Sequence, residues 1–193
     1  MWKVTSIQKM TPKYKGTPRP AVAVAGKSNV GKSTLINNVL GKKIANTSKT
    51  PGRTRGVHRF LINEQWDLVD LPGYGYAKVG MDLKMKFRDM VTNFLSGHGN
   101  LRQLIVLVDI RRGVGEIDFE MIEWAEHEGV GVTVILTKSD KLKNMHKKKA
   151  LQDAKKALEG RCNVFTHSST KGDGHEILKK KLVEWYSVDA FGE

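Results

Sequence analysis

A glycine-rich segment between an apolar run and a helical pattern constrains this chain more than any other feature. Its pattern is Gly-x-x-x-x-Gly-Lys-Ser, and it reads Gly26-Lys27-Ser28-Asn29-Val30-Gly31-Lys32-Ser33. Residues 21–25 before it predict a buried strand, and residues 34–40 after it predict a helix. Glycines let backbone N–H groups curl around phosphate oxygens, and the following helix N-terminus adds free donors and its positive dipole end. This order predicts a phosphate-binding loop rather than a chance match in a turn.

The side chains of this loop predict how a nucleotide would be held. Lys32 is placed to reach the β- and γ-phosphates, and the Ser33 hydroxyl is placed to bind Mg²⁺. Asn29 offers an amide oxygen, which either helps to hold K⁺ against the phosphates or only stabilises the loop. Spacing does not choose between these two roles for Asn29.

Apolar runs without polar alternation recur along the chain, and such runs are typical of parallel strands covered on both faces. Amphipathic spacing over 85–95 and 177–186 predicts two of the intervening helices. We therefore expect an α/β domain with a mostly parallel central sheet and helices on both faces. An antiparallel hairpin is expected to turn at Asn63-Glu64. The predicted strands cover residues 21–25, 59–62, 66–70, 104–108, 132–136 and 163–165.

Length and charge narrow the possibilities further. The 193 residues suit a single domain, which we place at 20–190, after a basic extension over 1–19. Lys plus Arg number 33 against 20 Asp plus Glu, a net charge of +13 that favours binding to polyanions over a role in solubility alone. The one cysteine suits a reducing compartment, and there is no lipidation motif or apolar run of about 18 residues. We expect a cytoplasmic protein without a membrane anchor.

Two further segments are expected to sense the γ-phosphate. Asp70-Leu71-Pro72-Gly73 ends a predicted strand, where Asp70 can hold a Mg²⁺-bound water and the Gly73 N–H can meet the γ-phosphate. The polar segment 47–56 lies between this motif and the phosphate loop. A threonine there should complete the Mg²⁺ shell, and spacing leaves three candidates. They are Thr47, Thr50 and Thr54.

The base is expected to be read further along the chain. Thr137-Lys138-Ser139-Asp140 closes the strand at 132–136. Asp140 can accept hydrogen bonds from the guanine N1–H and amine, which adenine does not offer, although an Asp here could also cap a helix. Lys138 would lay its aliphatic stem over the base. Ser168-Ser169 would direct a backbone N–H at the guanine O6.

Together these motifs resemble the EngB family of bacterial GTPases, in the TrmE-Era-EngA-EngB group of Ras-like P-loop GTPases. The resemblance spans Gly26 to Gly174, and Asp70-Leu71-Pro72-Gly73-Tyr74-Gly75-Tyr76-Ala77-Lys78-Val79 is its most specific part. It implies a single G domain, and it assigns the switch I threonine on Mg²⁺ to Thr54, in a nucleotide-binding segment Gly52-Arg53-Thr54. Two residues depart from the family pattern. They are Lys27, where Arg is more frequent, and His167, where Phe is usual at the edge of the base pocket.

Catalysis is expected to depend on Lys32, Thr54 and Gly73, with help from outside the chain. Tyr74 follows Gly73 where Ras-like proteins carry a water-orienting glutamine. We therefore expect slow intrinsic GTP hydrolysis, accelerated by K⁺ near Asn29 or by a partner.

The family resemblance implies that this GTPase assists assembly of the large ribosomal subunit, and the charge favours ribosomal RNA as its partner. We expect it to act as a monomer. Two other functions stay open. One is a GTPase of tRNA modification or signalling, and the other is a weakly catalytic GTP-sensing RNA-binding module. The basic residues that would contact RNA are Lys138, Lys141, Lys143, Lys147, Lys148, Lys149, Lys179, Lys180, Lys181, Arg111 and Arg112.

Overall fold

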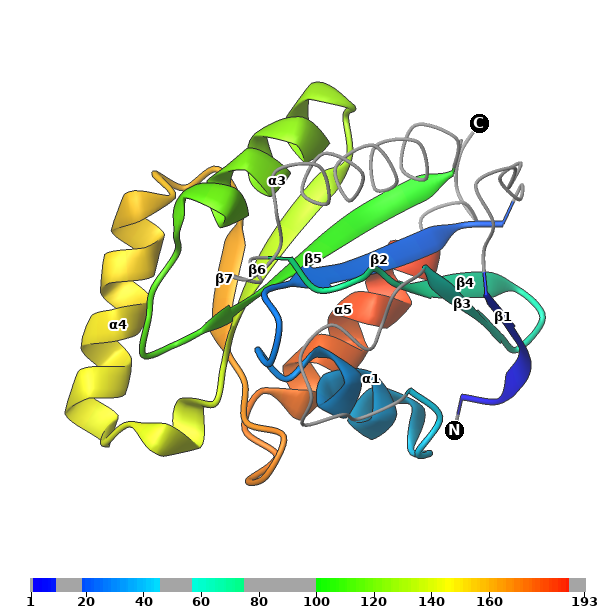
Figure 1. Ribbon diagram of the computed structural model, residues 1–193, viewed down its shortest axis with the longest axis horizontal. Helices are drawn as coiled ribbons and strands as arrows, with labels where there is room; N and C mark the ends of the chain where they lie inside the picture. Colours follow the sequence, from blue (N-terminus) through cyan, green and yellow to red (C-terminus); the bar gives the residue numbers. More distant parts are fainter. Residues whose placement is uncertain (1, 10–18, 46–56, 75–99, 188–193) are drawn as a thin grey trace.

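The computed structural model describes residues 2–9, 19–45, 57–74 and 100–187, and within them it forms one sheet covered by helices on both faces (Figure 1). The strands are β1 (Val4–Lys9), β2 (Ala21–Gly26), β3 (His58–Ile62), β4 (Trp66–Asp70), β5 (Leu101–Asp109), β6 (Gly131–Thr137) and β7 (Asn163–Thr166). The helices are α1 (Lys32–Leu40), α3 (Glu116–His127), α4 (Asn144–Ala157) and α5 (His175–Ser187), with a short 3-10 helix at Ser139–Lys141.

The sheet has seven strands in the order β1-β3-β4-β2-β5-β6-β7. Strands β4, β2, β5, β6 and β7 run parallel, whereas β3 is antiparallel to both of its neighbours. The predicted α/β class and mostly parallel sheet are confirmed. The helix expected over 85–95 lies outside the described residues.

Strand β2 shows why the central strands read as unbroken apolar runs. Ala21, Ala23 and Ala25 face the hydrophobic cluster that includes side chains of α3 and α4. Val22 and Val24 face the opposite cluster, which includes side chains of α1 and α5. Every residue of β2 is buried, so neither face of the strand accepts a polar side chain.

The hairpin of β3 and β4 is confirmed in the place the sequence predicts. Ile62 pairs with Trp66 across the turn, and Gln65 N–H donates to the Ile62 carbonyl at 3.0 Å. Asn63 and Glu64 have φ values of 49° and 61°, in the left-handed region. Asn tolerates that region well, which explains its place at the turn.

Part of the predicted extension belongs to the sheet. Val4–Lys9 forms the edge strand β1, which pairs antiparallel with β3. Trp2 packs edge-on against Trp66 with ring centroids 5.5 Å apart, and Trp66 stacks on Tyr186 of α5 at 3.5 Å. The sequence predicts no strand here because β1 is only half-buried and shows no clear alternation.

The topology brings the predicted site residues to one edge of the sheet. The carboxyl ends of parallel strands lie together, so the loops after β2, β4, β5, β6 and β7 meet. Gly26, Asp70, Asp109, Thr137 and Thr166 end these five strands. None of the helices within the described residues is long and apolar enough to cross a bilayer.

Candidate nucleotide-binding site

The loop over Gly26–Ser33 joins the end of β2 to the start of α1, as predicted. Gly31 caps α1 with φ of 107°, a conformation that favours glycine. A Cβ added to Gly26 would lie 2.8 Å from Val30 Cγ1 and 3.0 Å from Leu107, so this glycine is needed for close packing against β5. Asn29 at the tip also has a left-handed φ, of 64°, and its side chain is exposed. The loop therefore has the curled backbone that a phosphate-binding loop requires.

Lys32 and Asp70 lie against one another at the base of this loop. Lys32 Nζ forms an ion pair with Asp70 Oδ1, and both side chains are almost fully buried. Ser33 lies in the first turn of the same helix. A lysine, a hydroxyl, a carboxylate and a helix N-terminus form a donor set that fits phosphate together with Mg²⁺. The predicted phosphate and metal residues are thus brought together, except Gly52, Arg53 and Thr54, which lie outside the described residues.

The segment after Asp70 is attached to the phosphate loop by its backbone. Leu71 N–H donates to the Val24 carbonyl at 3.1 Å and Tyr74 N–H to the Gly26 carbonyl at 3.3 Å. In return, Ser28 N–H donates to the Tyr74 carbonyl at 2.9 Å. A Cβ on Gly73 would lie 3.2–3.3 Å from atoms of Ser28, so Gly73 packs directly on the loop. Leu71 and Pro72 are buried and support this approach.

Tyr74 points into the protein. Its side chain is only 4% exposed, and its hydroxyl donates to Asp118 Oδ1 of α3 at 2.8 Å. Burial, and then the neighbouring Asp118 carboxylate, raise the pKa of Tyr74 well above its usual value, so the hydroxyl stays protonated. The Tyr74 hydroxyl is therefore directed at α3 and engaged with Asp118.

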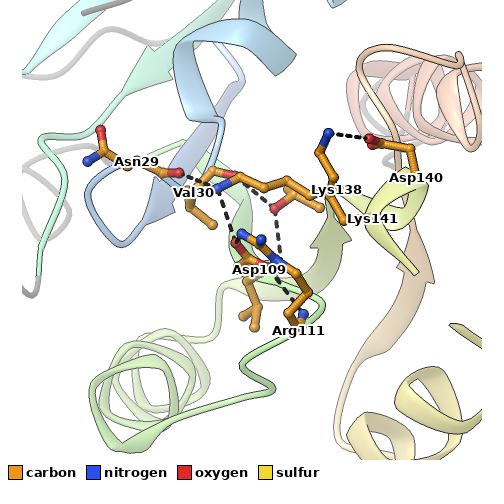
Figure 2. Close-up of polar contacts among 9 residues, drawn as sticks. Asn29, Val30, Asp109, Arg111, Lys138, Asp140 and Lys141 are labelled. Atoms are coloured by element: carbon orange, nitrogen blue, oxygen red, sulfur yellow. Dashed lines mark hydrogen bonds and ion pairs between the residues drawn. The ribbon is translucent and has the colours of Figure 1, made fainter. Parts of the chain in front are cut away.

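Residues at the end of β6 and just after it join the phosphate loop to the predicted base site. Thr137 Oγ1 lies 2.8 Å from the Val30 carbonyl, to which it donates, and 3.2 Å from the Val108 carbonyl. Lys138 has φ of 59°, which turns its side chain back over the loop. Its Nζ donates to the Asn29 carbonyl at 2.7 Å and lies 3.0 Å from Asp109 Oδ2, as Figure 2 shows.

Asp109 is a site residue that the sequence analysis did not select. Its carboxylate receives hydrogen bonds from Arg111 Nε at 2.9 Å and Nη2 at 2.7 Å, in addition to its contact with Lys138 (Figure 2). The hydrogen bonds from Arg111, and then from Lys138, hold the pKa of Asp109 far below its usual range. Asp109 ends a buried strand, as Asp70 does, and that position is a sequence feature that predicts a residue of this site.

Asp140 is held in place for a donor-rich ligand. Its Oδ1 accepts a hydrogen bond from Ser168 Oγ at 2.8 Å, and its Oδ2 lies 3.4 Å from Lys141 Nζ. The Ser168 hydrogen bond is the main cause of its lowered pKa, so the group is a carboxylate at neutral pH. Helix α4 begins at Asn144 with Lys143 as its N-cap, so Asp140 does not cap that helix.

The second predicted base segment, around Ser168-Ser169, is held by the first base segment and by helix α1. Ser139 N–H donates to the His167 carbonyl at 3.1 Å, and Asn38 Nδ2 of α1 donates to the Ser169 carbonyl at 2.8 Å. The His167 ring is only 1% exposed, and its nitrogens make no hydrogen bond with the described residues. Burial, and then His175, lower the pKa of His167 to about 4, so the ring is neutral. His167 therefore lies beneath the base segment rather than at its surface.

Known proteins that are similar to this chain are GTP-binding proteins, as its nucleotide-binding geometry leads us to expect. A family described as 50S ribosome-binding GTPase matches residues 21–138. The chain is 49% identical to a probable GTP-binding protein EngB of Thermoanaerobacter pseudethanolicus, over 76% of this chain and 73% of that protein. It is 42% identical to one from Escherichia coli strain HS, over 86% of this chain and 81% of the relative.

Two solved structures are similar in fold. One is a probable GTP-binding protein engB, with a TM-score of 0.71 and 25% identity over 86% of this chain and 98% of that one. The other is Era in complex with MgGDPNP and nucleotides 1506–1542 of 16S ribosomal RNA. It has a TM-score of 0.67 and 25% identity, over 86% of this chain and 56% of that one.

Proposed function

This chain belongs to the EngB family of GTP-binding proteins, and we propose that it is a switch that assists assembly of the large ribosomal subunit by binding ribosomal RNA. It is a GTPase. The proposed role in subunit assembly is supported by one observation. A nucleotide site that suits guanine occurs on the same domain as exposed lysines that no acid of the described residues neutralises. We further propose that it is a cytoplasmic monomer.

The nucleotide would be held at both ends of the site. The backbone of Gly26–Ser33 would surround the phosphates, with Lys32 released from Asp70 to contact them. Asp140 would accept the guanine donors, Lys138 would cover the base, and the Ser169 N–H would meet O6. Ser33 and Thr54 would hold Mg²⁺, which neutralises phosphate charge when bound. Gly73 would report the γ-phosphate through its N–H.

Hydrolysis in the isolated protein should be slow. The side chain that follows Gly73 is Tyr74, and its hydroxyl is engaged with buried Asp118. No polar group of Tyr74 is then free to orient water, so positive charge and orientation must come from K⁺ near Asn29 or from the ribosomal partner. Turnover should rise when K⁺ replaces Na⁺ or when large subunits are added. Fast turnover that ignores both would contradict this part of the proposal.

The lysines that suit RNA are fewer than the sequence predicts. Of the lysines in that prediction, five pair with acidic side chains of the described residues: Lys138, Lys141, Lys147, Lys179 and Lys181. Another set is exposed and forms no ion pair with described residues, so these lysines carry the charge that RNA phosphates can meet. Among the lysines predicted to contact RNA, this set consists of Lys143, Lys148, Lys149 and Lys180.

Sedimentation with purified large subunits tests the proposal. The protein should pellet with subunits in a GTP analogue and much less in GDP, and binding should weaken steeply with salt. Lys148→Ala with Lys149→Ala should weaken binding by roughly tenfold. Lys179→Ala with Lys181→Ala removes the same charge from ion-paired positions and should weaken it less. Equal pelleting in both nucleotides, or none in either, would favour one of the other two functions.

A further inference from the structure

A buried carboxylate outside the predicted motifs joins three segments of the site. Asp118 lies in the first turn of α3 and is 1% exposed. It receives the Tyr74 hydroxyl at 2.8 Å, Lys27 Nζ at 3.0 Å and the Gly115 N–H at 2.9 Å. Tyr74 follows the Asp70–Gly73 motif, and Lys27 belongs to the phosphate loop. We call Asp118 with Lys27 and Tyr74 the Asp118 clamp.

Burial of the Asp118 carboxylate is unfavourable by itself, and its hydrogen bonds and its ion pair compensate for that burial. A buried carboxylate loses several kcal/mol of hydration unless it is paired and hydrogen-bonded. Here a lysine supplies the opposite charge, and a hydroxyl and a backbone N–H fill the remaining positions. A Cβ added to Gly115 would lie 2.7 Å from Lys27 Nζ, so the glycine leaves room for this lysine to reach Asp118.

The clamp also determines where Gly73 lies. Three hydrogen bonds hold Tyr74. Its N–H donates to the Gly26 carbonyl, its carbonyl accepts from the Ser28 N–H, and its hydroxyl donates to Asp118. Gly73 precedes it and packs on Ser28. Any shift of Tyr74 therefore moves the Gly73 N–H relative to the loop that would hold the phosphates. GDP has no γ-phosphate, so such a shift would affect only the GTP-bound form.

We infer that Asp118 is a positioning residue for γ-phosphate recognition, which acts through Tyr74 and Lys27 to hold the Gly73 N–H in register with the phosphate loop. The inference rests on the proposed role of Gly73. According to this inference, the contact of Tyr74 with Asp118 of α3 helps the protein to distinguish GTP from GDP, although Asp118 touches neither nucleotide.

Nucleotide affinities of matched variants test this inference. The full chain carrying Asp118→Asn or Tyr74→Phe is titrated with fluorescent GDP and with a fluorescent non-hydrolysable GTP analogue. Asp118→Asn should weaken the GTP analogue by about tenfold and GDP by less than about twofold. Tyr74→Phe removes one hydroxyl and should weaken the GTP analogue by about threefold. Glu116→Gln is an exposed acid-to-amide change in the same helical turn and should alter neither affinity.

Two variants of Lys27 test whether its positive charge is required. Lys27→Met removes the charge that balances Asp118, and it should lower affinity for the GTP analogue as Asp118→Asn does. Lys27→Arg keeps a cationic donor on a side chain that is one-third exposed, so it should retain most of that affinity.

Several outcomes would overturn the inference. A parallel loss of both affinities in Asp118→Asn and Tyr74→Phe would mark Asp118 as merely structural, and so would no change in either. If Asp118→Asn does not fold, Tyr74→Phe alone decides, because it retains the ring and its packing. Failure of the unaltered chain to bind guanine nucleotides would instead refute the proposed nucleotide site.

Discussion

The two ends of the candidate site are built in different ways. At the base end, the two side chains proposed to contact guanine already rest on partners that the nucleotide would not displace, since Asp140 is held by Ser168 and Lys138 by the Asn29 carbonyl. At the phosphate end, Lys32 and Asp70 are engaged with one another. Both are proposed to turn to the nucleotide and its metal instead. One end is therefore preorganised, and the other must exchange partners.

This difference suits a switch. A preformed base end lets GDP and GTP bind alike, because the guanine contacts do not depend on the phosphate number. At the phosphate end, Lys32 and Asp70 must exchange one another for the nucleotide and its metal. The γ-phosphate of GTP can therefore change the conformation of the residues that surround it. Each variant below acts on one end, so together they can break or sharpen the contrast.

Asp140→Asn should have the largest effect on binding. An amide offers guanine one acceptor and one donor in place of two acceptors, so affinity for GDP should fall by about a thousandfold. Xanthine nucleotides, which carry an oxygen in place of the amine, should bind this variant better than guanine nucleotides do. Fluorescent-nucleotide titration measures both, and exposed Asp153→Asn is the control. Unchanged affinity for GDP would contradict the role of Asp140.

Lys32→Met should destabilise the nucleotide-free protein, because it leaves the buried Asp70 carboxylate without its cation. We expect the free energy of unfolding to fall by about 3 kcal/mol in urea titrations. Adding Asp70→Asn should recover most of that stability without recovering nucleotide binding. Stability unaffected by Lys32→Met would show that the two groups are not coupled at the phosphate end.

Protonation of His167 at low pH should lower the free energy of unfolding of the protein. The pKa of His167 is about 4 in the folded protein and about 6.5 when unfolded, so the unfolded chain takes up the proton first as pH falls. The contribution of His167 to stability should be fully present well above pH 6.5 and should fall by on the order of 3 kcal/mol by pH 4. His167→Phe should lose that part of the pH dependence in urea titrations across the range. An identical pH profile in the variant would assign the loss to other groups.

Ser168→Ala should give the smallest effect, since it removes one hydrogen bond and keeps the Asp140 carboxylate. Affinity for GDP should fall by about tenfold at neutral pH. The pKa of Asp140 should rise toward its usual value, because the Ser168 bond is the main cause of its lowering. Binding of GDP should therefore be lost at a higher pH than in the unaltered protein. An unmoved pH midpoint would show that Ser168 does not tune Asp140.

Local patterns were enough for much of this site. Gly26–Ser33 was predictable because strand, loop and helix follow one another directly, and Asp70 and Asp140 because each follows a buried strand. Asp118 was not predictable, because it lies 91 residues from Lys27 and 44 from Tyr74. Strand β1 was missed for a related reason. Its partners in β3 lie about 50 residues or more along the chain, and β1 itself shows little apolar pattern.

The sequence by itself determined the fold class, the phosphate loop, the hairpin and the family, because each depends on residues that are neighbours along the chain. Only the tertiary structure decided which groups are engaged with which. It buried Tyr74 against Asp118, paired Lys32 with Asp70 and placed Lys138 between Asn29 and Asp109. These contacts join segments that follow separate strands, and their geometry follows from the parallel sheet that brings those strand ends together.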